Sequence, residues 1–273
     1  MNLLKRLFRF YINSSIHVAL AVVALVGVTV MEYDLAIPYY LLGFVFFGTI
    51  TGYNFVKYAE VAGLQHRNLT DSLKTIQVFS FFCFGILLFF LFHLSVHTLV
   101  MVGVFAMLTF FYAVPFLKHK NLRTFSGLKI FIVAVVWAGV TVFVPLAASK
   151  VELTTDDWLT FVQRFFIVVA LILPFEIRDL RYDVTALKTL PQQIGIRKTK
   201  LFGVVLLMLC ILVEGFKDVL SSNYLYSLLF VCLLIGVLLI ASKKKQTRYF
   251  ASFWVESVPI FWWGLFVVLE SLF

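Results

Sequence analysis

The chain has 273 residues, of which 62% are hydrophobic and only 14% are charged, and its mean hydropathy is +1.00. A soluble domain has roughly 25% charged residues, so this composition excludes an ordinary water-soluble fold. The net charge of +9 would suit a nucleic-acid partner, but the basic residues stand in short loops between apolar runs. That distribution is typical of a membrane protein, so we expect the lipid bilayer as a partner and no nucleic acid.

Nine apolar segments are long enough to cross a bilayer, which takes about 20 residues in a helix. Because a spanning segment must satisfy its own backbone hydrogen bonds, we predict an all-α integral membrane protein with nine transmembrane helices. The loops are too short for a separate domain, so residues 1–273 form one transmembrane domain in this prediction. The predicted spans are residues 15–32, 37–57, 75–93, 97–116, 126–148, 158–177, 200–217, 224–242 and 249–271.

The loops between these segments alternate in charge. Of the 23 Lys and Arg residues, 20 lie in the N-terminal segment or in the loops 57–74, 117–129, 178–200 and 243–248. Loops rich in Lys and Arg stay in the cytoplasm. We therefore expect a multi-pass protein of the plasma or inner membrane with a cytoplasmic N-terminus and, because the number of spans is odd, an outer C-terminus.

Three acids stand at the predicted cytoplasmic end of the sixth span. Glu176, Asp179 and Asp183 are spaced i, i+3, i+7, which places them on one face of a helix. Carboxylates on one stripe repel each other unless a cation lies between them, and Mg²⁺ takes oxygen ligands and bridges to phosphates. The alternative is a solvated helix end at which Arg178 and Arg181 neutralise the acids.

Two neighbouring segments extend this pattern. The acids are followed by Lys188-Thr-Leu-Pro191 and Gly195, and Tyr112-Ala-Val-Pro115 with Lys118 follows the fourth span. Together the segments resemble the UbiA superfamily of intramembrane prenyltransferases. Its second aspartate-rich motif is D-x-x-D-x-x-x-D, with Glu176 in place of the first Asp here. Nine helices with active-site loops on the cytoplasmic side agree with the same family.

The first motif of that family, N-x-x-x-D-x-x-x-D, is only partly present. Asn54 matches its Asn and Arg67 matches the Arg that follows it, but Tyr58 and Ala62 occupy the two aspartate positions. Neither Tyr nor Ala can hold Mg²⁺ in that geometry. We therefore expect one Mg²⁺ rather than two.

The resemblance implies Mg²⁺-assisted transfer of a prenyl group from an isoprenoid diphosphate to an aromatic or other lipid-precursor acceptor. It implies Glu176, Asp179 and Asp183 as metal ligands, with Asp179 and Asp183 as catalytic residues. Lys57 lies one helical turn after Asn54, although it is equally an interfacial lysine that reaches towards water. The predicted substrate-binding residues are Asn54, Lys57, Arg67, Tyr112, Lys118 and Lys188.

Two other functions fit the sequence less well. A family member without its first metal site could bind or transport an isoprenoid lipid without chemistry. A small-solute transporter is disfavoured, because no pair of spans broken by Gly or Pro lies at mid-membrane.

Three charged residues lie inside predicted spans. Arg164 and Glu214 are at similar depth near the outer surface, so we expect a structural ion pair between them. Glu256 lies about eight residues into the last span, where an acid is costly and functional by default.

Overall fold

The computed structural model describes residues 3–64, 71–114, 127–181 and 189–272, and the side chains of 59–64 and 71–72 are not described. Every regular element in these ranges is a helix, which confirms the predicted all-α class. The helices are α1 (Leu3–Asn13), α2 (Ile16–Glu32), α3 (Tyr39–Leu64), α4 (Asp71–Leu91), α5 (Val96–Ala113), α6 (Lys129–Ala148), α7 (Thr155–Asp179), α8 (Leu190–Glu214), α9 (Ser222–Ala241), the π-helix η3 (Phe250–Val255) and α10 (Val258–Leu272).

Each predicted span overlaps one long helix, with η3 and α10 together forming the last. Seven helices in the described ranges are long and apolar enough to cross a membrane, and the bent pair α1–α2 makes up to eight. The remaining predicted span corresponds to α8, whose first part carries Arg197, Lys198 and Lys200. The multi-pass architecture is therefore confirmed, whereas the count of nine stays a prediction.

Local sequence signals begin several of these helices. The Ser95 and Ser221 hydroxyls accept hydrogen bonds from backbone N–H groups three residues later, at the starts of α5 and α9. At the start of α7, the Asp157 carboxylate accepts the backbone N–H of Thr154 at 2.7 Å. These contacts satisfy N–H groups that have no partner within the helix.

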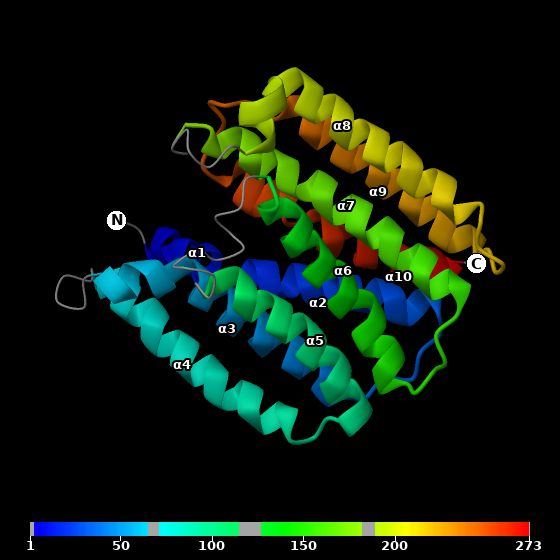
Figure 1. The fold of residues 1–273 in the computed structure, drawn as a ribbon, viewed down its shortest axis with the longest axis horizontal. Coiled ribbons are helices and arrows are strands. Elements are labelled where there is room, and N and C mark those ends of the chain that lie inside the picture. The colour runs from blue at the N-terminus through cyan, green and yellow to red at the C-terminus, as the bar shows by residue number, and fades with distance from the viewer. Residues whose placement is uncertain (1–2, 65–70, 115–126, 182–188, 273) are drawn as a thin grey trace.

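Two large apolar cores and one small cluster of buried residues hold the bundle together. One large core is built mainly from α7, α8, α9 and the last span, and the other mainly from α2, α3, α5 and α6. Helices α8 and α9 lie on one side of α7, while α4 lies at the opposite edge beside α3 (Figure 1). α6 packs against α7 and α2, so it joins the two halves and stands beside the cavity described below.

The chain bends by 54° between α1 and α2. Ser15 at the bend has a φ of 65°, which ends the first helix. The ring of Phe8 in α1 packs edge-on against Tyr249 and Phe253 of the last span, with ring centroids 5.0 and 5.3 Å apart. α1 therefore folds across the end of the bundle at which η3 begins (Figure 1).

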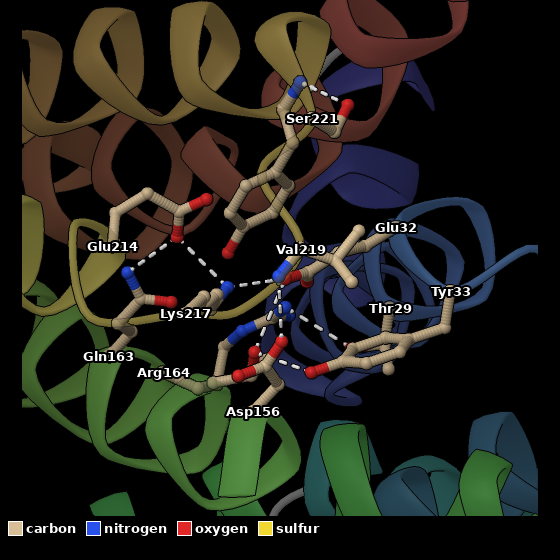
Figure 2. Close-up of polar contacts among 12 residues, drawn as sticks. Thr29, Glu32, Tyr33, Asp156, Gln163, Arg164, Glu214, Lys217, Val219 and Ser221 are labelled. Atoms are coloured by element: carbon tan, nitrogen blue, oxygen red, sulfur yellow. Dashed lines mark hydrogen bonds and ion pairs between the residues drawn. The ribbon is translucent and has the colours of Figure 1, made fainter. Parts of the chain in front are cut away.

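A buried polar network occupies the opposite end of the bundle (Figure 2). The Lys217 ammonium lies 2.6 Å from Glu32 Oε1 and 2.9 Å from Glu214 Oε2. Gln163 donates a further hydrogen bond of 2.9 Å to Glu214. Lys217 thus ties α2 to the end of α8 through two buried carboxylates.

The expected Arg164–Glu214 ion pair is wrong. Arg164 instead donates to the backbone oxygen of Leu25 at 2.7 Å and to Thr29 Oγ1 at 3.1 Å, and its guanidinium lies over the Trp262 ring. The basic partner of Glu214 is Lys217, only three residues away in the sequence. Arg164 and Glu214 were expected to pair because they lie at a similar depth in the membrane. The face of α7 that carries Arg164, however, is turned towards α2.

Candidate active site

A cavity of about 850 Å³ lies within the bundle, between α2, α3, α5, α6, α7 and the start of the last span. Along α3 its wall runs from Lys57 to Phe44, a distance of about 20 Å at 1.5 Å per helical residue. The cavity therefore reaches through much of the thickness of a bilayer.

Charge gathers at one end of this cavity, which we call the mouth. The charged residues of the mouth in the described part of the chain are Lys57, Lys129, Glu176, Arg178, Asp179 and Arg248, and Glu256 lies next to them on the wall. The mouth forms where α3 and α7 end and where α6 and η3 begin. Four cations stand against three acids when Glu256 is included, so the net charge of these residues is positive and favours an anion.

The deeper part of the cavity, which we call the chamber, is walled mainly by aliphatic and aromatic side chains. They include Val22, Phe44, Leu87, Phe105, Val140 and Val144. Apolar walls of this kind bind hydrocarbon and exclude water. A ligand that matches the whole cavity has an anionic head and an apolar tail.

Lys129 and Glu176 form an ion pair of 3.0 Å at the mouth. The Glu176 side chain is 3% exposed, whereas that of Lys129 is 36% exposed. The two residues meet because α6 begins and α7 ends at the same end of the bundle. Lys129 therefore neutralises a predicted metal ligand.

Arg178 and Asp179 form a second pair at the mouth. Arg178 Nε lies 2.7 Å from Asp179 Oδ1 and Nη2 lies 3.2 Å from Oδ2, so the contact is bidentate. The guanidinium also lies over the Phe175 ring, 5.2 Å from its centroid. This geometry follows the alternative interpretation of the motif, in which arginine neutralises the acids.

The described residues alone do not complete a site for Mg²⁺. No group of three potential ligands gathers within the described ranges, and the oxygens of Glu176 and Asp179 already face cations. α7 ends at Asp179, and Leu180 and Arg181 lie in a turn, so the described helix carries only Glu176 and Asp179 of the predicted stripe. Asp183 itself lies outside the described residues.

Asn54 does not line the cavity. Its side-chain amide donates to the backbone oxygen of Ser14 at 3.0 Å and to Ser80 Oγ at 2.8 Å, and its oxygen accepts from Ser15 Oγ at 2.8 Å. The residue is 3% exposed. Asn54 therefore holds the α1–α2 bend against α3 and α4 and is not among the residues that line the cavity.

Lys57 and Tyr112 do lie on the cavity wall. The Lys57 ammonium donates to the backbone oxygen of Asn13 at 3.2 Å, and Tyr58 Oη donates to the same oxygen at 2.9 Å. Tyr112 is buried at the end of α5, within electrostatic range of Lys129. The predicted residues Arg67, Lys118 and Lys188 lie outside the described residues.

Four cavity residues were missed or left without a partner by the sequence interpretation. Arg248 belongs to a basic run that was used only to assign topology. Tyr53 accepts a hydrogen bond of 2.7 Å from Trp137 Nε1 on the cavity wall, and neither residue stands in a motif. Glu256 was singled out as an intramembrane acid, and the structure places it in the cavity wall.

The helices and the cavity that they enclose define an intramembrane bundle with the UbiA fold. No family model and no curated protein matches the sequence. Among solved structures, the bundle is similar to a digeranylgeranylglyceryl phosphate synthase, with 14% identity over 97% of both chains and a TM-score of 0.58.

Two archaeal UbiA homologues are similar over almost their whole length. One, from Aeropyrum pernix K1, has 13% identity over 93% of this chain and 98% of the homologue, with a TM-score of 0.65. The other, from Archaeoglobus fulgidus, was solved with DMAPP and Mg²⁺ and has 10% identity over 94% and 97%, with a TM-score of 0.64. At these identities the likeness establishes the fold.

Proposed function

We propose that this protein is an intramembrane prenyltransferase. An isoprenoid diphosphate binds with its head at the mouth and its hydrocarbon chain in the chamber. The observation that carries the proposal is the segregation of charge within one cavity: cations surround one end and apolar side chains wall the remainder. The fold supports the same function, because similar structures hold DMAPP or GPP together with Mg²⁺.

The mouth supplies the electrostatics that this reaction needs. When the bond between the allylic carbon and the diphosphate oxygen breaks, negative charge grows on the diphosphate. Lys57, Arg178 and Arg248 are positioned to stabilise that charge. The apolar chamber excludes water, which protects the cationic carbon until an aromatic or other lipid-precursor acceptor attacks it.

A single Mg²⁺ remains part of the proposal, with Asp179 and Asp183 as the acids expected to hold it. When bound, the ion would neutralise part of the diphosphate charge. In the described residues Asp179 faces Arg178 instead, so the stabilisation that the chain itself offers to the diphosphate comes from its cations.

A second candidate function is binding or transport of an isoprenoid lipid without chemistry. The specific observation in its favour is that both described acids of the second motif are paired with cations. Tyr58 and Ala62 stand where the first motif of the family has aspartates. On this alternative the cavity would hold the ligand and leave it intact.

Incubation of the purified protein with radiolabelled prenyl diphosphates and a panel of quinone precursors separates the two functions. We expect a prenylated product whose formation increases with Mg²⁺. A ligand that binds and is recovered intact with every acceptor would favour the binding protein. A chain that neither binds nor converts any prenyl diphosphate would contradict both functions.

A further inference from the structure

Glu256 follows an irregular turn in the last span. The helix η3 (Phe250–Val255) has π-type geometry, and the Glu256 N–H donates to the backbone oxygen of Ala251, five residues earlier, at 3.2 Å. Such turns occur often at functional sites, because the extra residue changes the direction of the side chains that follow. Here Ser252, Val255 and Glu256 contribute to the cavity wall.

The Glu256 carboxylate has no hydrogen bond or ion pair to another residue that the structure describes. This distinguishes it from Glu176 and Asp179, which are both paired at the mouth. The side chain is half-buried and lines the cavity. Its oxygens are thus open to a ligand.

The surroundings place Glu256 at the boundary between the mouth and the chamber. The charged groups that act on it are Lys57 and Arg178, and Tyr53 is also within electrostatic range. Tyr53 lies one helical turn deeper in α3 than Lys57. Burying an acid at this depth in a membrane costs free energy. Its position beside two cations therefore indicates a function for Glu256.

We propose that Glu256 binds the acceptor of the prenyl group and receives its proton. This inference rests on the proposed prenyltransferase function and names the acceptor class. A diphosphate held at the mouth places its allylic carbon at the boundary where Glu256 stands. The acceptor at this position carries a hydroxyl group that donates a hydrogen bond to Glu256.

The transfer step balances with Glu256 as the base. The carbon–oxygen bond of the prenyl diphosphate breaks and its electron pair leaves with the diphosphate. The acceptor supplies the electron pair of the new bond to the allylic carbon, from its oxygen or from a ring carbon. The acceptor proton passes to the Glu256 carboxylate and from there to water. No oxidant or reductant is required.

Calorimetric titration of the full-length protein, saturated with farnesyl thiodiphosphate, tests this assignment. The ligands are naphthol, naphthalene and naphthoate, which share one ring system and differ in the group offered to Glu256. We expect naphthol to bind about tenfold tighter than naphthalene, because only naphthol has a hydroxyl group that can form a hydrogen bond with Glu256. Naphthoate should bind more weakly than naphthol.

The Glu256→Gln variant should remove most of the preference for naphthol. It should bind farnesyl thiodiphosphate at least as tightly as the wild type, which shows that the cavity is intact. Glu256→Asp should retain part of the preference, and Glu270→Gln, an exposed glutamate near the end of the same span, should retain all of it. With the reactive farnesyl diphosphate, Glu256→Gln should slow transfer to naphthol at least a hundredfold.

Equal binding of naphthol and naphthalene by the wild type would overturn the inference, even if the Gln variant failed to fold. Unchanged naphthol preference and transfer in Glu256→Gln would overturn it as well. Both results leave the proposed function intact. Failure of the wild type to bind farnesyl thiodiphosphate contradicts the proposed function itself.

Discussion

The Lys129 ammonium and the Glu176 carboxylate lie 3.0 Å apart at the mouth of the cavity. Lys129 is the first residue of α6, and Glu176 lies three residues before the end of α7. The pair joins the two helices at the point where the proposed diphosphate head binds. It also removes Glu176 from the set of acids free to hold a metal.

Replacement of Lys129 by Ala should destabilise the protein, because it leaves the Glu176 carboxylate buried without this partner. We expect the free energy of unfolding to fall by about 1–3 kcal/mol. This is less than for a fully buried ion pair, because Lys129 is partly exposed to solvent. Thermal unfolding in detergent measures it. Lys198→Ala, on an exposed part of α8, is the matched control and should have no effect. Equal midpoints for the two variants would show that the ion pair contributes nothing.

Asn54 should act on stability rather than on ligand affinity. Asn54→Ala removes three hydrogen bonds and takes this partner from the buried Ser14 backbone oxygen and the buried Ser15 hydroxyl, so we expect the free energy of unfolding to fall by about 2–3 kcal/mol. The affinity for farnesyl thiodiphosphate should change less than threefold. A variant as stable as the wild type that no longer binds the ligand would return Asn54 to the substrate site that the family resemblance implied.

The network in Figure 2 depends on Lys217. Lys217→Met leaves Glu32 and Glu214 as two buried carboxylates without their cation, so we expect a loss of about 3–5 kcal/mol. The control Lys244→Met changes an exposed lysine at the other end of the bundle and should be neutral. The unfolding midpoints of the two variants are compared in the same detergent. A Lys217→Met variant as stable as the wild type would contradict the role of Lys217 in the network.

The chamber should set the length of prenyl chain that binds. Val140 lies on the wall at the middle of α6, so Val140→Trp fills part of the chamber. We expect the affinity for farnesyl thiodiphosphate to fall at least tenfold while that for the dimethylallyl analogue stays within threefold, because only the longer chain reaches this depth. Val237→Trp faces outwards from α9 and should change neither. An equal loss of affinity for both analogues would contradict the binding of the prenyl chain in the chamber.

Much of the fold could be predicted from the sequence, because membrane spans have a simple physical requirement. Each apolar segment must form a helix, so hydropathy alone located the helices to within a few residues at most ends. Two helix ends differ more. α3 continues to Leu64 and α8 begins at Leu190, both beyond their apolar segments, because polar helical turns extend past the hydrocarbon.

The candidate site was predicted less completely, since pairing depends on how the helices face one another. The spacing of Glu176 and Asp179 predicted one shared helix face, and both acids lie on the cavity wall in the structure. Nothing in the sequence indicated that Lys129, 47 residues earlier, would meet Glu176. Asn54 matched a family position, yet its partners Ser14 and Ser80 come from segments that show no motif.

The most direct test is a calorimetric titration of the full-length protein with farnesyl thiodiphosphate. We predict saturable binding of one ligand per chain, with farnesol and inorganic diphosphate each at least tenfold weaker, because each fills only the chamber or only the mouth. The double variant Lys57→Gln/Arg248→Gln should weaken binding about a hundredfold or more, since each charge-assisted contact contributes about 1.5–3 kcal/mol. Lys244→Gln/Lys245→Gln, which removes the same charge from an exposed loop, should leave binding unchanged. Absence of saturable binding, or equal affinities for the two double variants, would contradict a prenyl diphosphate site in this cavity.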